Sequence, residues 1–331
     1  MDREGFRQLL RERQVPEDQL DAQIALAERF EAFAGGPPAP GDVRAFAAIL
    51  VDEALNTWDN LVTLVRYAHF TKNVPAYVAA VELLDGSEAL EGLYEKLGQA
   101  VGEELRDQVF SGIELPPLGT PSTEKPVITQ AIMTRLEQLV DPETCRQVLS
   151  SGLRHLEDAW YAEERAKYAE SGSVDAYLAR KGDDLIAQLN KIKDEGGLYF
   201  TQPITDEVIA FVERHPEIRQ GVRDGNVIYE AKIPYMTVEY LAETDEQMKC
   251  HYYCHCPWVR ESLRSADVRV SPTFCLCSAG FHKKRWDVIF GQELRAEVVE
   301  SVLQGDPWCK MAIHLPEEAL TGPTAPSLSG G

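Results

Sequence analysis

Residues 275–316 decide the fold of the C-terminal part of the chain, and they read CLCSAGFHKKRWDVIFGQELRAEVVESVLQGDPWCKMAIHLP. The pattern of 278–291 predicts a helix. Residues 294–303 and 309–315 predict two strands, because each run is rich in apolar and β-branched residues. Between the strands, the sequence Gln-Gly-Asp-Pro at 304–307 favours a tight turn. A helix beside a β-hairpin indicates an α+β domain with an antiparallel sheet.

The segments before this stretch extend the same domain. Residues 226–234 (NVIYEAKIP) alternate between apolar and polar positions and predict another strand. Helices are predicted at 127–140, 155–170 and 173–194, the last ending at a Gly-Gly pair. The C-terminal part is therefore expected to be a mixed α/β domain.

The N-terminal part is predicted to be helical throughout. Long amphipathic stretches at 42–72 and 74–110 favour a helical bundle. Residues 114–127 contain four prolines and little apolar pattern, as a linker would. The predicted domains are a helical bundle at 1–115, a linker at 116–126, a cysteine-rich α+β domain at 127–317 and a disordered tail at 318–331.

Composition limits the classes of function. The chain of 331 residues has 54 acidic and 33 basic residues, giving a net charge of -21. Such a field repels nucleic acid and anionic membranes, so neither is expected as a partner. No stretch approaches the roughly 20 apolar residues of a membrane helix, and the N-terminus lacks the apolar core of a secretory signal. We expect a cytoplasmic protein with reduced thiols, in which clustered cysteines indicate metal binding or reactivity.

Two cysteine pairs stand out in the C-terminal part: Cys254 with Cys256, and Cys275 with Cys277. On a strand or extended loop, side chains two apart point the same way, so each pair would offer two sulfurs to one side. Four thiolates suit zinc, or less favourably iron or an iron–sulfur cluster. The alternative is that these cysteines are buried like small apolar residues.

The same stretches contain candidate groups for catalysis. Cys256 and Cys277 each precede a predicted helix, where a thiol has a lowered pKa and becomes a better nucleophile or ligand. His255 and His282 are the candidate bases. His255 lies between two cysteines, so on a strand it would face away from them.

A basic run follows His282 on the predicted helix. Lys283, Lys284 and Arg285 are candidates to hold the anionic end of a substrate, although a solvated helix face is the alternative. Tyr253 is a candidate for the wall of the pocket, with core packing as its alternative.

The order of motifs in 275–316 resembles known families. Cys275 is followed by Gly280-Phe281, a helix, an acidic strand and the sequence Gly-Asp-x-x-Cys ending at Cys309. This order resembles the ligand-binding module of 4-vinyl reductase-type domains and of phenol-responsive regulators. Together with Cys256-Pro257 it is also similar to the L-2-amino-thiazoline-4-carboxylic acid hydrolase family. The wider region 126–316 looks like an uncharacterised bacterial family with YCHCPW and FCxCSAGFHKK blocks.

The resemblance implies particular roles. In the phenol-sensing proteins, cysteines and a glutamate hold a zinc ion. Cys275 and Cys309 match two of these cysteines, the third falls at Ser301, and the glutamate falls at Val298, two residues before Glu300. Glu300 is accordingly a candidate catalytic carboxylate. The predicted metal ligands are Cys254, Cys256, Cys275, Cys277 and Cys309.

Three hypotheses follow. The first is a small-molecule enzyme, a hydrolase that acts on a carboxylated or sulfur-containing substrate at a cysteine-rich metal site. The second is a metal-stabilised sensor of a small molecule, in which the helical N-terminal domain forms a homodimer or transmits the signal. The third is an interaction scaffold with cysteines in its core. The sequence contains no P-loop and no basic DNA-reading helix as an output module, which favours an enzyme or a stand-alone binding protein.

Overall fold

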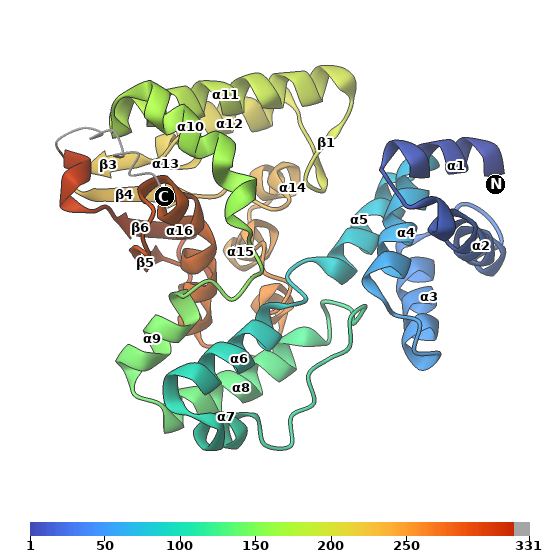
Figure 1. The fold of residues 1–331 in the computed structure, drawn as a ribbon, viewed down its shortest axis with the longest axis horizontal. Coiled ribbons are helices and arrows are strands. Elements are labelled where there is room, and N and C mark those ends of the chain that lie inside the picture. Colours follow the sequence, from blue (N-terminus) through green and yellow to red (C-terminus); the bar gives the residue numbers. More distant parts are fainter. Residues whose placement is uncertain (321–331) are drawn as a thin grey trace, which may run out of the picture. The chain divides into compact units, whose positions relative to one another are not determined.

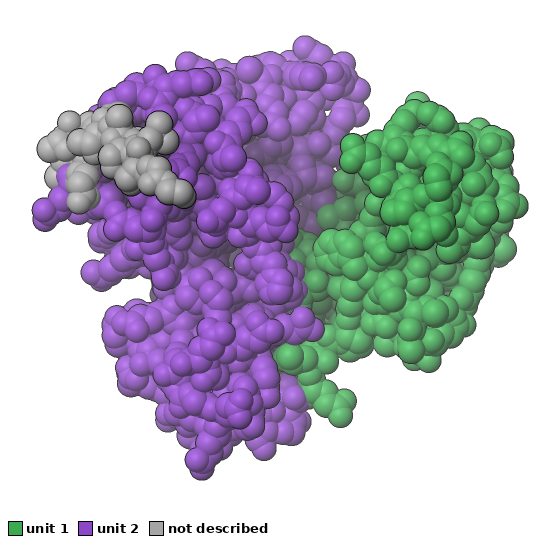
Figure 2. All heavy atoms as spheres, in the orientation of Figure 1, with its two compact units in different colours: residues 1–87, 114–128 green, residues 88–113, 129–331 purple. Residues whose placement is uncertain are grey.

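The computed structural model describes residues 1–320, which form two compact units (Figures 1 and 2). Unit 1 contains Met1–Ser87 and Glu114–Ile128, and unit 2 contains Glu88–Ile113 and the chain from Thr129 onward. Most of the structure is helical, with two small antiparallel sheets, so the fold is α+β.

The two units divide the chain differently from the predicted domains. Residues 88–113, assigned by sequence to the N-terminal bundle, belong to unit 2, where Lys96 donates to the carbonyl oxygen of Ser151 at 2.7 Å. The predicted linker belongs to unit 1, where Leu118 packs on the core and accepts a hydrogen bond from Asn56. The predicted tail begins inside a 3-10 helix, Glu317–Leu320, and otherwise lies outside the described residues.

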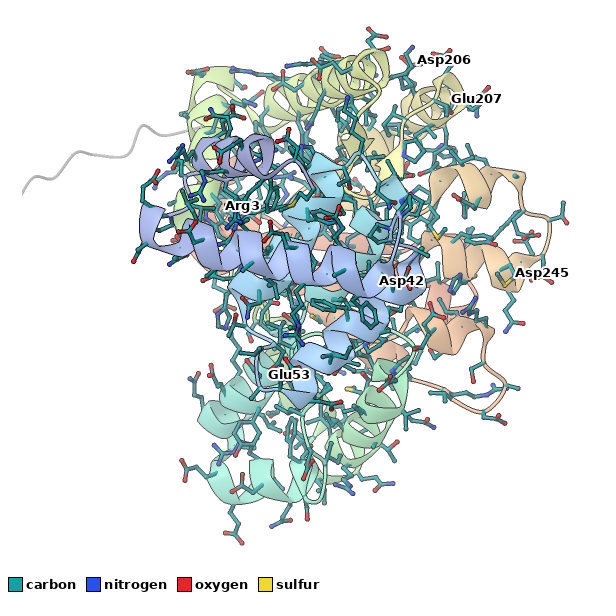
Figure 3. All side chains as sticks on the ribbon, turned by 90° about the vertical axis from the view of Figure 1, so that its right-hand side faces the viewer. Arg3, Asp42, Glu53, Asp206, Glu207 and Asp245 are labelled. Atoms are coloured by element: carbon teal, nitrogen blue, oxygen red, sulfur yellow. The ribbon has the colours of Figure 1, made fainter. Side chains whose placement is uncertain are left out.

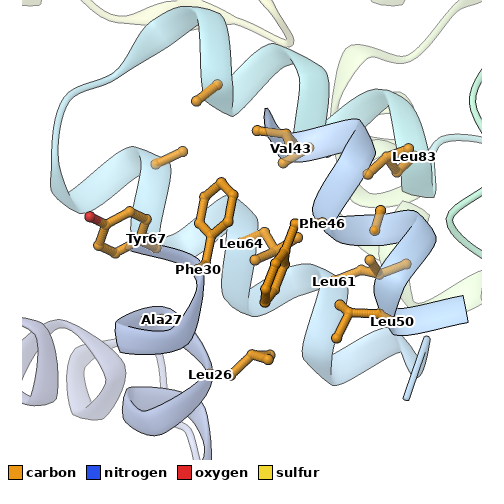
Figure 4. Close-up of a cluster of buried hydrophobic side chains, with 14 of the residues drawn as sticks. Leu26, Ala27, Phe30, Val43, Phe46, Leu50, Leu61, Leu64, Tyr67 and Leu83 are labelled. Atoms are coloured by element: carbon orange, nitrogen blue, oxygen red, sulfur yellow. The ribbon is translucent and has the colours of Figure 1, made fainter. Parts of the chain in front are cut away.

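Unit 1 is a helical bundle whose core is aromatic and aliphatic. Phe30 packs against Phe46 at 5.1 Å and against Tyr67 at 5.8 Å between ring centroids (Figure 4). The predicted stretch 42–72 is two helices, because the chain turns at Ala54, which has a φ of 55°. The helices are α1 (Arg3–Glu12), α2 (Glu17–Ala34), α3 (Pro40–Asp52), α4 (Trp58–Phe70) and α5 (Val74–Leu84).

Acidic residues begin several helices in both units. Asp42 accepts a hydrogen bond from the Ala39 amide at the start of α3, and Asp245 accepts one from the Met248 amide at the start of α15 (Figure 3). Negative charge there is favourable, because the first amides of a helix lack partners and carry a partial positive charge. Part of the acidic excess therefore stabilises helix ends.

Unit 2 contains most of the helices and the larger sheet. Its helices are α6 (Ala89–Val101), α7 (Glu103–Phe110), the part of α8 (Lys125–Leu139) from Thr129, α9 (Pro142–Ser150), α10 (Ala162–Ser171), α11 (Val174–Glu195), α12 (Asp206–Arg214), α13 (Pro216–Arg219), α14 (Thr237–Ala242), α15 (Glu246–Tyr253) and α16 (Leu276–Phe290). The small sheet pairs β1 (Leu198–Tyr199) with β2 (Gln202–Pro203).

The larger sheet has the order β3-β4-β6-β5 and is antiparallel. Its strands are β3 (Val222–Asp224), β4 (Val227–Ala231), β5 (Arg295–Glu300) and β6 (Lys310–His314). The predicted hairpin is present, although the first strand ends early because Val302–Gln304 forms a 3-10 turn. Ile228 of β4 lies in one core cluster with Trp286 of α16, whereas Ala231 lies in another with residues of α12. The central strand β4 is therefore covered on both faces.

A glycine allows α16 to approach the end of α9. A Cβ atom at Gly280 would lie 2.7 Å from the carbonyl oxygen of Ser150 and 2.8 Å from the amide nitrogen of Gly152. Since both are backbone atoms, they cannot rotate away. We expect Gly280→Ala to lower the free energy of unfolding by about 1–3 kcal/mol in urea titrations. Gly41→Ala, at an open helical position, should instead leave stability unchanged or raise it; equal effects would contradict the close approach.

Among residues 1–320, no helix is both long enough and apolar enough to cross a membrane.

Candidate functional site: the thiol cluster and the His282 centre

The five predicted metal ligands gather in one region of unit 2. Cys254 and Cys256 follow α15, Cys275 and Cys277 lie where a 3-10 turn joins α16, and Cys309 directly precedes β6. Besides burial, the pKa of Cys254 is raised by Cys256 and Cys309, and that of Cys275 by Cys309, Cys254 and Cys256. The thiols are therefore close enough to interact electrostatically.

The local geometry of the pairs differs from the prediction. Cys277 lies in the first turn of α16, not on a strand. Because successive helical residues are rotated by about 100°, a residue two positions away points elsewhere, so Cys275 and Cys277 do not form the expected side-by-side pair. The predicted lowering of the Cys277 pKa was also wrong, since burial raises it to about 12.

Ser301 lies between the two cysteines that the resemblance matches to zinc ligands. Its side chain is fully buried, and its Oγ is 3.2 Å from the Sγ of Cys275. Burial raises the pKa of Cys309, and hydrogen bonding to Ser301 partly opposes this shift. The position expected to supply a third cysteine therefore does lie beside Cys275 and Cys309.

The chemistry of the cysteine thiolates favours a metal ion, but the arrangement of the side chains does not. Thiolates are suitable ligands for zinc. However, in the described part of the chain no group of three or more His, Cys, Asp or Glu side chains is arranged to hold a metal ion. As arranged, the residues do not fit a metal site, and zinc and the iron alternatives stay predictions.

A histidine–carboxylate pair lies on the neighbouring face of α16. The Nδ1 of His282 is 3.5 Å from the Oε2 of Glu230, which is on β4 and 4% exposed. The Nε2 of His282 is buried and has no hydrogen-bond partner within residues 1–320. Burial lowers the pKa of His282 to about 4, although Glu230 opposes the shift. The imidazole is therefore neutral at pH 7, with an available lone pair on Nε2.

This pKa shift predicts a pH dependence of stability. Because the pKa of His282 falls from 6.5 to about 4 on folding, the unfolded chain binds the proton first as the pH falls. The stabilisation is complete above pH 6.5 and is lost progressively down to about pH 4, by up to about 3 kcal/mol. Urea titrations across this window should show that His282→Gln removes this part of the pH dependence. Parallel curves for the variant and the wild type would contradict the shift.

Two cations flank His282. Lys232 donates from Nζ to the Oγ of Ser278 at 2.9 Å, and no described carboxylate forms an ion pair with it. Arg285 lies 3.9 Å from Glu230 and 4.0 Å from Glu164, distances too long for hydrogen bonds. Its Nε is buried without a hydrogen-bond partner among the described residues, although the side chain as a whole is 31% exposed.

The three residues of the predicted basic run point in different directions, because successive residues of a helix are rotated about its axis. Buried Lys283 pairs with Asp287 at 3.1 Å and with Glu293 at 3.0 Å. Lys284 pairs with Asp158 at 2.5 Å. Both lysines line a hollow of about 2250 Å³ in unit 2, whose lining does not include His282 or Arg285. Of the three predicted cations, only Arg285 belongs to the His282 centre.

The remaining predicted residues are engaged by the protein. His255 contacts the carbonyl oxygen of Ile233 through Nε2 at 2.7 Å, and burial lowers its pKa to about 3. Tyr253 is fully buried and donates to the carbonyl oxygen of Lys232 at 2.9 Å. Glu300 accepts hydrogen bonds from Trp308 and Lys310, each at 2.6 Å.

Sequence reasoning missed Glu230, Lys232 and Lys181, the last of which forms an ion pair with Glu230. The alternation in 226–234 assigns Glu230 and Lys232 to the polar face of a half-exposed strand. The structure covers that face with α16, so Glu230 is buried and Lys232 is half-buried. Two charged residues, one in β4 and one just after its end, were the available signal, but recognising the strand as central requires the tertiary structure.

Comparison with known families finds a match in the C-terminal part of the chain. Residues 236–320 match a family of unknown function, DUF6144. The matched segment is less than half of the chain; it includes α16, the hairpin and all five predicted metal ligands, and it begins just after Glu230 and Lys232. No curated protein and no solved structure matches the chain.

Proposed function

We propose that the chain is a hydrolase of small carboxylated molecules, with its reaction centre at His282. The observation that carries this proposal is the buried Nε2 of His282, which has no hydrogen-bond partner among the described residues, while Nδ1 of the same ring contacts Glu230. A base held by a carboxylate, with its second nitrogen available, is the usual arrangement for moving a proton to or from water. The resemblance to the thiazoline carboxylate hydrolase family supports the same chemistry.

The chemistry uses groups that the structure places together. Lys232, which has no carboxylate partner among the described residues, binds the substrate carboxylate. Nε2 of His282 removes a proton from water as the water oxygen bonds to the electrophilic C=O or C=N carbon. The imidazolium returns this proton to the leaving nitrogen or sulfur when that bond breaks. Glu230 stabilises the imidazolium between the two transfers.

The test is a turnover assay with the full-length protein. Carboxylated thiazolines, thioesters and amides are incubated with the protein, and the release of thiol or amine is measured. Each compound is compared with its neutral methyl ester, which Lys232 should not select. We expect turnover of at least one class, with strong preference for the free carboxylate. Absence of turnover across all three classes would refute the hydrolase.

The second candidate is metal-stabilised binding of a small molecule without catalysis. The specific observation is Ser301, which lies beside both Cys275 and Cys309. The 4-vinyl reductase type of fold, the cytoplasmic location and a homodimer through the helical N-terminal region belong to the same proposal. The resemblance supports the type of fold, and the compact helical unit 1 is the part that would form the homodimer.

Metal content tests this candidate. This candidate requires about one zinc per chain after purification without added metal, because thiolates select zinc. Cys275→Ser and Cys309→Ser should each lose the zinc, whereas Cys145→Ser should retain it. Cys145 is on α9, and its Sγ lies 3.6 and 3.7 Å from backbone carbonyl oxygens at the end of α8. Elemental analysis decides the outcome, and a metal-free wild type would remove the metal from both candidate functions.

A further inference from the structure

Ser278, His282 and Arg285 occupy one face of α16. They are spaced at i, i+4 and i+7, so they project from the same side in successive turns. Lys232 contacts Ser278 at 2.9 Å, which places its ammonium group at the N-terminal end of this face. The two cations therefore lie on either side of His282, and the rise of 1.5 Å per residue puts Ser278 and Arg285 about 10 Å apart along the axis.

Both cations keep donors that the protein does not use. Within residues 1–320 the Nε of Arg285 makes no hydrogen bond, and the two neighbouring carboxylates, of Glu230 and Glu164, lie at 3.9 and 4.0 Å. Glu164 is engaged by the hydroxyl of Tyr177, which donates to the same Oε2 at 2.5 Å. Lys232 has a hydroxyl and the face of the Phe281 ring as neighbours but no described carboxylate partner. An external anion would be the first carboxylate at Lys232, and at Arg285 it could approach more closely than the 3.9 and 4.0 Å of Glu230 and Glu164.

We infer that the site takes a dianion: a small molecule with two carboxylate-like groups, one held by Lys232 and the other by Arg285. The molecule spans His282, which faces the bonds between its two charged ends. This inference rests on the proposed function for the role of His282, but the recognition of two charges concerns binding alone.

Calorimetric titration of the full-length protein with simple anions tests the inference. The probes are succinate, glutarate and adipate, with butyrate as the single-charge control. We expect at least one dicarboxylate to bind about tenfold or more tightly than butyrate. Arg285→Met and Lys232→Met should each reduce its affinity to that of butyrate. Arg180→Met and Lys191→Met remove cations on α11 that pair with surface acids, and they should leave binding unchanged.

The inference is overturned if no dicarboxylate binds more tightly than butyrate, or if both site variants retain the preference. Should Arg285→Met fail to fold, Arg285→Lys keeps the charge but not the planar fork and should weaken dicarboxylate binding selectively. The two proposals can fail separately. Dicarboxylate binding without turnover of any carboxylated compound refutes the hydrolase alone, and turnover of monocarboxylates without preference for two charges refutes the dianion alone.

Discussion

Replacing Glu230 with leucine is expected to lower the free energy of unfolding by about 3–5 kcal/mol, because it leaves buried cations without their counter-charge. Glu230 is bonded by Lys181 and contacted by His282 and Arg285. Burial alone would raise its pKa, but Lys181 and His282 hold that pKa well below its usual range. The carboxylate is therefore ionised at neutral pH, and its removal cannot be relieved by a proton.

The partner substitution sharpens this test. In the double variant Glu230→Leu with Lys181→Met, both charges of the closest pair are absent, and much of the lost stability should return, as for other buried pairs replaced together. Glu297→Leu serves as the control, since this carboxylate lies on β5 and is 41% exposed, and it should change stability by less than about 0.5 kcal/mol. Urea titrations of the four proteins give the comparison. A loss below about 1 kcal/mol in Glu230→Leu would show that the cluster is effectively solvated.

Replacing His282 with glutamine is expected to lower kcat by about 10²–10⁴, once a hydrolysed compound has been found. Glutamine keeps a donor for Glu230 but cannot carry a proton between water and a leaving group. Because burial lowers the pKa of His282 to about 4, the rate of the wild type should fall on the acid side near pH 4 and not near 6.5.

His314→Gln is the matched control for this activity. His314 is also a half-buried histidine near a carboxylate, 3.6 Å from Glu297, but it lies at the opposite end of β6 from Lys310. Its replacement should leave kcat and the acid limb unchanged. If both variants retain wild-type kcat, His282 is not the base, and the proton must be moved by another group.

Local patterns predicted a large part of the fold, and non-local packing determined the rest. The helix at 278–291 and the hairpin after it are visible because apolar spacing and turn residues act over a few neighbours. The turn at Ala54 was missed because alanine carries no turn signal, and its positive φ is imposed by the surrounding bundle. The assignment of residues 88–113 to unit 2 depends on contacts with residues more than fifty positions away, such as Lys96 with Ser151.

The candidate site was predicted by residue type more than by position. The clustered cysteines and His282 were recognisable because such residues are few and bear chemistry. Their pKa values could not be predicted, because burial depends on the whole fold. At Cys277 the effect of burial on the pKa outweighs that of the helix terminus. The contiguous run Lys283, Lys284 and Arg285 looked like one clamp, yet helical rotation sends each side chain to different partners. Lys232 was not recognised, because the alternating sequence predicts a strand with one exposed face. In the structure, β4 is covered on both faces.

The discontinuous composition of unit 1 bears on how the chain folds during synthesis. Residues 114–128 complete this unit only after 88–113, which belong to the other unit, have left the ribosome. Until then, the first 87 residues either stay unfolded, or fold with part of their core uncovered and bind residues 114–128 later. A fragment ending at residue 87, or one starting at 127, would lack part of its own unit. Expression of either half should begin from boundaries that respect this interleaving.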